Sequence, residues 1–184
     1  MKVYTLRLNL RGISPLVWRR LRVPGMTSLA TLHEMIQIVN HWDNDHLHCF
    51  HIYALGYGIS YEGGLDFRKN AYKIFLDDFN FSAGDKFHYE YNFSAPYIVD
   101  IRIEAITEIN ESENNKKILC IQGNGMPGVT KSELSHVYFR ILEKLANMKP
   151  HAKLKKLLPL IEKFQEMRFS RQQMNQRFLS ELTS

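Results

Sequence analysis

The stretch that sets the fold class is residues 16–51, which read LVWRRLRVPGMTSLATLHEMIQIVNHWDNDHLHCFH. Its first eight residues alternate as a strand does, and Pro24-Gly25 ends that strand. Over residues 27–42 the period becomes helical, Thr27 or Ser28 can cap the start, and the buried stripe would consist of Leu29, Leu32, Ile36 and Val39. Residues 46–53 then return to the strand pattern.

Strand patterns also precede and follow this stretch. Residues 3–10 alternate apolar and polar side chains, and they would form a hairpin with residues 16–23. Further along, residues 87–93 alternate aromatic side chains, residues 98–106 alternate apolar and charged ones, and residues 118–122 suit a short last strand. The sequence therefore predicts an α+β fold, with a largely antiparallel β-sheet, ββαβ order at the N-terminus and C-terminal helices.

The C-terminal part of the chain has helical periodicity. It begins near residue 130, and a second helical segment covers about residues 151–182, with a break or kink expected at Pro159. We therefore expect an α+β domain over 1–128 and a basic helical extension over 129–184 that packs on it. One face of that extension, available for packing or for self-association into a homo-oligomer, would consist of Phe164, Met167, Met174, Phe178 and Leu182.

The composition is that of a soluble protein of the cytoplasm. Of the 184 residues, 45% are hydrophobic and 23% are charged, which is ordinary for globular proteins. We expect no signal peptide and no membrane span, because the N-terminal residues alternate and no run approaches roughly 18 apolar residues. Cys49 and Cys120 allow at most one disulfide, and reduced thiols are expected.

The positive charge is concentrated near the C-terminus. From Lys131 onward there are 11 basic and 5 acidic residues, a net charge of +6, whereas the rest of the chain is nearly neutral. Such an extension can attract nucleic acid or an acidic protein partner through its helices. The simpler interpretation is a solvated, lysine-rich helix surface.

Residues 41–51 hold the densest group of candidate metal ligands, with four histidines, two aspartates and a cysteine. On a strand, His46 and His48 would share one face, where both imidazoles could bind zinc or another divalent metal, and Asp43 or Asp45 could supply an oxygen ligand. The remaining ligands would have to come from elsewhere, for example from His33 or His88. The structural alternative is a turn at residues 43–45 with hydrogen-bonded histidines, and the sequence favours it, so no metal ligand and no catalytic residue is assigned.

Trp18-Arg19-Arg20 is the second candidate binding element. Alternation places Trp18 and Arg20 on one face of the strand and Arg19 on the other. The guanidinium groups could clamp a phosphate or a carboxylate, or their stems could simply cover the Trp18 ring. If Arg19 faces inward it must be paired, because an isolated buried charge is costly, and Asp43 or Asp45 would be reasonable partners.

Two further patterns are weaker indications of function. The aromatic row Phe87, Tyr89, Tyr91 and Phe93 could stack nucleic-acid bases, although such a row is more often core. The glycine-containing segment 123–132 lies between a strand and a helix, but its lysine is displaced by two residues from the position that a nucleotide-binding P-loop requires. Nucleotide hydrolysis is therefore not expected.

Two segments of the sequence resemble a known family. Residues 10–52, LRGISPLVWRRLRVPGMTSLATLHEMIQIVNHWDNDHLHCFHI, and residues 84–93, GDKFHYEYNF, are similar to motifs of the plasmid pRiA4b ORF-3-like family, over about residues 3–125 in all. The chain departs from the family pattern after Phe93, where acidic residues and a tryptophan are usual, and after Cys120, where a cysteine-rich loop is common. The resemblance implies a protein of plasmids or a passenger of transposons whose biochemical role is undefined.

These observations support two hypotheses of function. The first is a non-catalytic binding or accessory protein of a mobile element, which binds nucleic acid or a protein partner. Its candidate binding residues are Trp18, Arg19, Arg20, Asp43, Asp45, His46 and His48. The second is a metal-dependent, hydrolase-like enzyme centred on His46 and His48, with Asp45 as a further ligand.

Overall fold

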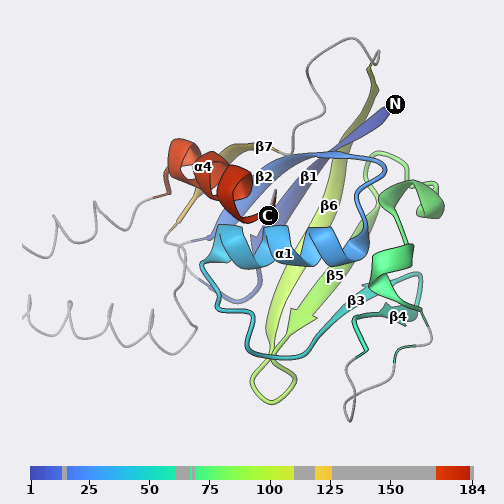
Figure 1. The fold of residues 1–184 in the computed structure, drawn as a ribbon, viewed down its shortest axis with the longest axis vertical. Coiled ribbons are helices and arrows are strands. Elements are labelled where there is room, and N and C mark those ends of the chain that lie inside the picture. Colours follow the sequence, from blue (N-terminus) through green and yellow to red (C-terminus); the bar gives the residue numbers. More distant parts are fainter. Residues whose placement is uncertain (14–15, 61–66, 68, 110–118, 126–168, 183–184) are drawn as a thin grey trace, which may run out of the picture.

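The fold is a seven-stranded antiparallel sheet with helices packed on one of its faces (Figure 1). The computed structural model describes residues 1–13, 16–60, 67, 69–109, 119–125 and 169–182. The strands are β1 (Lys2–Leu10), β2 (Trp18–Pro24), β3 (His48–Ile52), β4 (Leu55–Tyr57), β5 (Lys86–Tyr91), β6 (Tyr97–Glu108) and β7 (Leu119–Asn124). The helices are α1 (Leu29–Asn40) and α4 (Arg171–Glu181), with 3₁₀ turns η1 (Ala71–Lys73) and η2 (Leu76–Phe79).

The strands lie in the order β4-β3-β5-β6-β1-β2-β7, and every neighbouring pair is antiparallel. The predicted hairpin of β1 and β2 is present, and it pairs Asn9 with Trp18 and Arg7 with Arg20. The N-terminal order β1, β2, α1, β3 is the predicted ββαβ order. The α+β class with a largely antiparallel sheet is therefore confirmed.

Helix α1 begins and ends where its local sequence allows. The Ser28 hydroxyl accepts a hydrogen bond from the Thr31 backbone N–H at 3.1 Å, and it thereby satisfies one donor that the first helical turn leaves free. At the other end His41 adopts a left-handed conformation, φ 53°, which closes the helix with bonds to the carbonyls of Gln37 and Ile38. The predicted apolar stripe is completely buried against the sheet: Leu29, Leu32, Ile36 and Val39.

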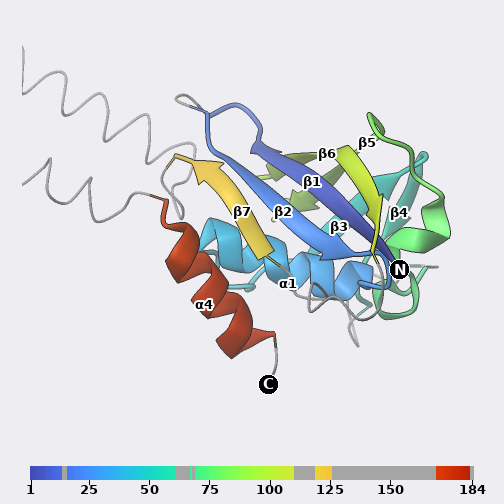
Figure 2. The same ribbon diagram turned by 90° about the horizontal axis from the view of Figure 1, so that it is seen from above.

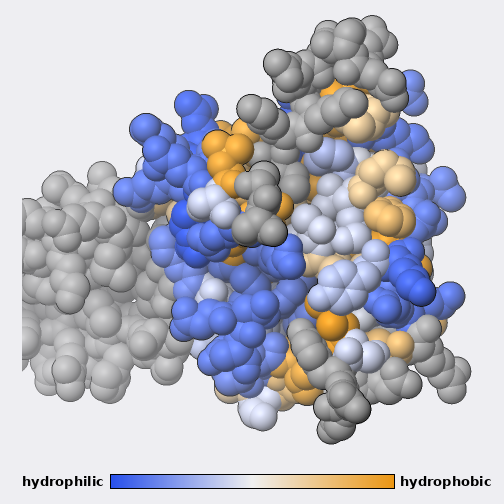
Figure 3. Space-filling view, viewed as in Figure 1, coloured by the Kyte–Doolittle hydropathy of each residue, from blue (hydrophilic) through white to orange (hydrophobic). Residues whose placement is uncertain are grey.

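The core lies between the sheet and the two described helices. Strand alternation sends Tyr4, Leu6, Leu8 and Leu10 inward from β1, and Phe87, Tyr89 and Tyr91 inward from β5. Seen from above, α1 and α4 lie on the same side of the sheet (Figure 2). That helix-covered side is mostly hydrophilic at its surface over α4 and α1 (Figure 3). In the described part of the chain, no helix covers the opposite face, which we call the open face.

Helix α4 is the described end of the predicted C-terminal extension. Its Met174 and Phe178 are buried, as predicted, and the helix packs on β7 and α1. Asn175 joins it to the edge of β7, because its side chain accepts from the Cys120 N–H at 2.8 Å and donates to the Cys120 carbonyl at 3.1 Å. The predicted helix from residue 130, Pro159 and Phe164 lie outside the described residues. The division of the chain at residue 128 stays a prediction.

Several strand boundaries differ from those predicted, and two of them lie beside candidate residues. Strand β3 begins at His48, two residues later than expected, because Asp45 and its neighbours are held in a loop by Tyr91. Strand β5 ends at Tyr91, because Asn92 adopts a left-handed conformation, φ 62°, and the exposed Phe93 does not continue the aromatic row. The buried Tyr89 and Tyr91 rings are core, so the aromatic row does not form a stacking surface.

No helix among the described residues combines the length and the apolar composition that crossing a membrane requires.

The Ser28 cap provides a test of how α1 is anchored. We expect Ser28→Ala to lower the free energy of unfolding by about 1 kcal/mol, because the Thr31 N–H loses its acceptor at the helix start. Urea denaturation followed by circular dichroism measures this change. Ser82→Ala, at an exposed loop position, is the control. Equal urea midpoints for the two variants would contradict the role of Ser28.

Candidate functional site

Arg19 is fully buried, with 1% of its surface exposed, and it faces the helices as alternation predicts. The predicted pairing with Asp43 or Asp45 is wrong. The guanidinium instead donates to four backbone carbonyls, those of Val39 (3.1 Å), Trp18 (2.8 Å), Asn124 (2.7 Å) and Gly125 (3.3 Å). Both aspartates are too far along the loop, at exposed positions outside the core.

The Arg19 side chain therefore supplies donors to several carbonyl groups, among them that of Val39, for which the last helical turn offers no donor of its own. It reaches the last turn of α1 through Val39 and the end of β7 through Asn124 and Gly125, and its guanidinium lies 4.9 Å from the centre of the Phe169 ring. Burial lowers the pKa of this guanidinium to about 10, which leaves it charged at neutral pH. Arg19 is thus a structural link between the layers, and its binding role finds no exposed surface to act on.

The two histidines expected to share a metal lie apart. His46 precedes β3 and is exposed, with its ring nitrogen Nε2 3.6 Å from Asp45. His48 is the first residue of β3 and is 2% exposed, with its ring in the core. Among the described residues, no group of three His, Cys, Asp or Glu side chains is placed to hold a metal ion. The shared face predicted for His46 and His48 fails because the strand starts between them.

Asp45 is hydrogen-bonded within the loop between α1 and β3, whereas Asp43 faces a groove. The Tyr91 hydroxyl donates to the Asp45 carboxylate at 2.7 Å and accepts from the Asp45 N–H at 2.9 Å. The hydrogen bond from Tyr91 lowers the pKa of Asp45, while burial, followed by that same hydrogen bond, raises the pKa of Tyr91 to about 12. Asp43 lines a groove of about 280 Å³ between α1 and α4, together with Trp42, Arg177 and Glu181.

His48 stacks on His33 in the core, with ring centres 3.6 Å apart and planes 10° from parallel. His33 is hydrogen-bonded at both nitrogens, to the Tyr89 hydroxyl (2.8 Å) and to the Asn44 side chain (2.7 Å). Both nitrogens of His48 are buried, and neither has a hydrogen-bond partner among the residues that the structure describes. Burial lowers the pKa of His33 to about 4 and of His48 to about 3, so both rings are neutral at pH 7.

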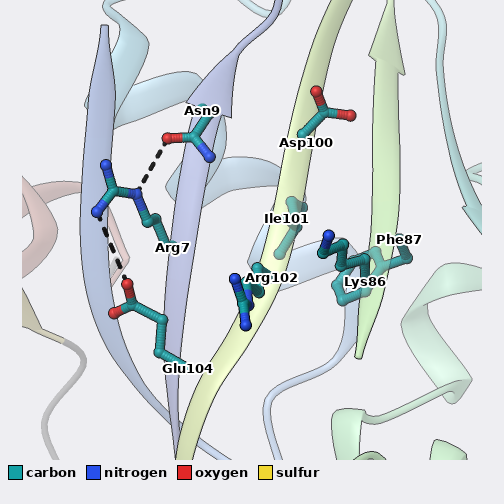
Figure 4. Close-up of a pocket in the computed structure, with 8 residues that line it drawn as sticks. All are labelled: Arg7, Asn9, Lys86, Phe87, Asp100, Ile101, Arg102 and Glu104. Atoms are coloured by element: carbon teal, nitrogen blue, oxygen red, sulfur yellow. Dashed lines mark hydrogen bonds and ion pairs between the residues drawn. The ribbon is translucent and has the colours of Figure 1, made fainter. Parts of the chain in front are cut away.

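The open face carries three cations that sequence reasoning missed, Arg7, Arg102 and Lys86, beside Arg20, which it had named. In register across four neighbouring strands lie Arg20 on β2, Arg7 on β1, Arg102 on β6 and Lys86 on β5, which we call the cation row. Adjacent strands are about 4.8 Å apart, so the row extends about 14 Å. Figure 4 shows Arg102 and Lys86 side by side on their strands.

The Glu104 carboxylate partly neutralises two members of the cation row, Arg20 and Arg7. Glu104 lies at a bulge of β6, where the register against β1 shifts, and it extends across β1 to accept from Arg20 Nη2 at 3.0 Å. Arg7 is 3.9 Å from the same carboxylate and donates to Asn9 at 3.2 Å. The hydrogen bond from Arg20 lowers the pKa of Glu104. Arg102 and Lys86 form no ion pair with any carboxylate in the described ranges.

Trp18 is half-buried on the open face, beside the row. The Arg7 guanidinium lies 4.4 Å from the centre of its ring and that of Arg20 lies 5.5 Å away. The prediction that arginine side chains cover this tryptophan is confirmed. The acid partner of Arg20, however, lies on β6, beyond the neighbouring strand β1.

A shallow depression of about 720 Å³ lies beside the cation row (Figure 4). Strand β6 forms its floor, and residues of β1 and β5 line its sides. The cations Arg7, Arg102 and Lys86 line one end together with the Glu104 carboxylate, and Asn9 and Asp100 line the other. Alternation alone would have placed each of these side chains outward, but the register that aligns them comes only from strand pairing.

Comparison with known proteins agrees with the resemblance found in the sequence. The family model described as plasmid pRiA4b ORF-3-like protein matches residues 2–173, which extends past the segment quoted above. The uncharacterized protein y4hQ of Sinorhizobium fredii (strain NBRC 101917 / NGR234) is 31% identical over 106 residues, 55% of this chain and 53% of that protein, so the chain spans about half the length of this relative. The crystal structure of a protein of unknown function, MM3350 from Methanosarcina mazei Go1, has a TM-score of 0.67 and 26% identity, and covers 94% of this chain and 97% of that one.

The link made by Arg19 can be tested by a conservative change. We expect Arg19→Lys to lower the free energy of unfolding by about 2–4 kcal/mol, because one ammonium cannot reach carbonyls on both α1 and β7. Arg22→Lys, the same change on the open face of β2, is the control and should cost less than about 0.5 kcal/mol. Chemical denaturation measures both values. Similar midpoints for the two variants would show that Arg19 is not the link.

The stacked histidines predict acid sensitivity. Below pH 6.5 the unfolded chain takes up protons at His33 and His48, whereas the folded chain does so only near pH 4 and pH 3. Stability therefore falls as pH decreases through this window, by up to about 1.4 kcal/mol per pH unit for each ring. We expect His48→Phe to flatten the dependence by one such contribution, measured by urea denaturation between pH 7 and pH 4.

His46→Gln is the control for this experiment, because His46 is exposed and outside the core. It should keep the pH dependence of the unchanged protein. An equally steep pH dependence in His48→Phe would show that the buried ring is not a source of the acid sensitivity.

Proposed function

The chain belongs to the plasmid pRiA4b ORF-3-like family, and from that premise we propose that it is a non-catalytic nucleic-acid-binding protein that holds phosphates on the open face of its sheet. The cation row is the observation that carries this proposal. Like charges on directly opposite residues of neighbouring strands destabilise a sheet, and this row places four in succession. A bound polyanion would remove that repulsion.

The chemistry of the row suits phosphate. Guanidinium groups bind phosphate oxygens through paired N–H donors, and a lysine ammonium binds them as a point charge. Arg102 and Lys86 are exposed, and no described carboxylate competes for them at ion-pair distance. Binding that depends on such contacts weakens as salt rises, because each occupied phosphate releases counterions.

The basic C-terminal third would add long-range attraction to the same partner. Its net charge of +6 lies mostly outside the described residues, and α4, which packs on β7 and α1, carries Arg171 and Arg177, of which Arg177 is paired with Glu181. A charge of this size raises the rate of association with a polyanion without specifying where the polyanion rests. The cation row is the part that would position it.

The alternative of a metal-dependent hydrolase has less support. It needs His46 and His48 on one ion, and these side chains lie on opposite sides of the core boundary, one exposed and one buried.

The proposal is tested with the full chain and a fluorescent oligonucleotide of mixed sequence. We expect Lys86→Gln/Arg102→Gln to weaken binding tenfold or more at low salt, measured by fluorescence anisotropy. The slope of log affinity against log salt concentration should fall by roughly 1.4 on a single strand, since two phosphate contacts are lost.

Lys69→Gln/Lys73→Gln is the matched control, because it removes the same charge at exposed positions near η1. It should keep most of the affinity and the salt slope. Equal losses in both double variants, or no binding by the unchanged protein at low salt, would refute a phosphate site on the open face.

A further inference from the structure

We infer that the nucleic acid is a single strand, with its phosphates on the cation row and an unpaired base in the depression beside it, where Asp100 selects bases that carry an amino group. This inference rests on the proposed function and adds to it the class of ligand and a residue that sets base preference.

The first step is the second row of side chains on the open face. It is displaced from the cation row by two residues along each strand, about 7 Å. It contains Trp18, Asn9, Asp100, His88 and His51, each paired in register with the next. The cation row presents only positive groups, whereas this row presents amide, carboxylate, imidazole and indole groups. The two rows therefore match the two ends of a nucleotide, one anionic and one made of neutral donors, acceptors and ring faces.

The depression combines both rows at one place. Lys86 and Arg102 line its cationic end, and Asn9 and Asp100 line its other end. It extends from β1 to β5, two strand intervals, or about 10 Å. A volume of about 720 Å³ is within the range of small-ligand sites. A nucleotide lying along β6 would place its phosphate and its base on opposite ends of this floor.

The shape of the open face argues against a double helix. A protein reads duplex bases by inserting a helix or a two-stranded ribbon into a major groove about 12 Å wide. The depression lies over β1, β6 and β5 in the middle of a seven-stranded sheet, and no narrow element of the described chain projects from it. Duplex phosphates could reach the cation row, but duplex bases could not reach Asn9 or Asp100. Only an unpaired strand can use both ends, because its bases are free to turn outward.

Asp100 gives the site a chemical preference. Both of its carboxylate oxygens accept from Arg11, but the side chain is half-exposed and each oxygen has a second lone pair that can accept from a base. A carboxylate accepts hydrogen bonds from amino groups such as that of cytosine and repels groups that only accept. Thymine carries no amino group. The site should therefore favour oligo-dC over oligo-dT.

The test compares labelled oligo-dC, oligo-dT, oligo-rC and a mixed-sequence duplex on the full chain by fluorescence anisotropy. We expect oligo-dC to bind about fivefold or more tightly than oligo-dT, and the duplex to bind more weakly than oligo-dC. The comparison of oligo-rC with oligo-dC identifies which backbone is preferred, and tight binding of either supports a single strand.

The decisive variant is Asp100→Ala, with Glu108→Ala as the matched control at an exposed position of the same strand. Both remove one negative charge, so both should raise the affinity for oligo-dT slightly. Only Asp100→Ala should bring the ratio of oligo-dC to oligo-dT affinity close to one. A ratio that Asp100→Ala leaves unchanged, or duplex binding as tight as oligo-dC binding, would overturn the inference. If Lys86→Gln/Arg102→Gln still weakened binding in that case, the proposed phosphate site would stand without it.

Discussion

The buried guanidinium of Arg19 is the interaction on which the rest of the structure depends. It donates to carbonyls of α1, β2 and β7 at once, and so joins the helix layer to the far edge of the sheet. A charge in the core is stable only when its donors are satisfied, and carbonyl groups satisfy these without any carboxylate. Because strand side chains alternate, burying Arg19 forces Trp18 and Arg20 outward onto the open face. One inward residue thus sets the orientation of the candidate site.

The two faces of the sheet differ in the kind of side chain that they carry. On the helix-covered face, α1 and α4 bury aliphatic and aromatic side chains, and hydrophobic burial supplies the stability. On the open face, charged side chains line up across β2, β1, β6 and β5, with Glu104 compensating only part of the row. A surface selected for stability alone would intersperse charges of both signs. The cation row departs from that expectation, which is why we propose a phosphate ligand for it.

The histidine pair inside the core departs from another expectation. His33 is hydrogen-bonded at both nitrogens, whereas the nitrogens of His48 have no partner among the described residues despite burial. Stacking on His33 and on Tyr89 supports the His48 ring only while both imidazoles are neutral. His48, which the sequence suggested as a metal ligand beside His46, instead stacks with His33 as a packing element that depends on pH. Its effect is on the stability of the whole domain, since it lies between α1 and β3.

The local sequence pattern was sufficient to predict many of the helices and strands of this protein. The strand and helix periods of residues 3–52, the Ser28 cap and the inward position of Arg19 follow from neighbours in the chain, and so does family membership. What local pattern could not supply was which strands lie side by side. Arg7 and Arg102 are 95 residues apart in the sequence. They align with each other and with Lys86 only because β1, β6 and β5 pair in one register. The partners of Arg19 could not be predicted from the sequence either, because every residue has a backbone carbonyl and the sequence does not show which of them will lie nearby. Spacing along the chain determined the elements and the face that each residue takes, whereas strand pairing alone decided which charges meet, because that pairing is a property of the folded sheet.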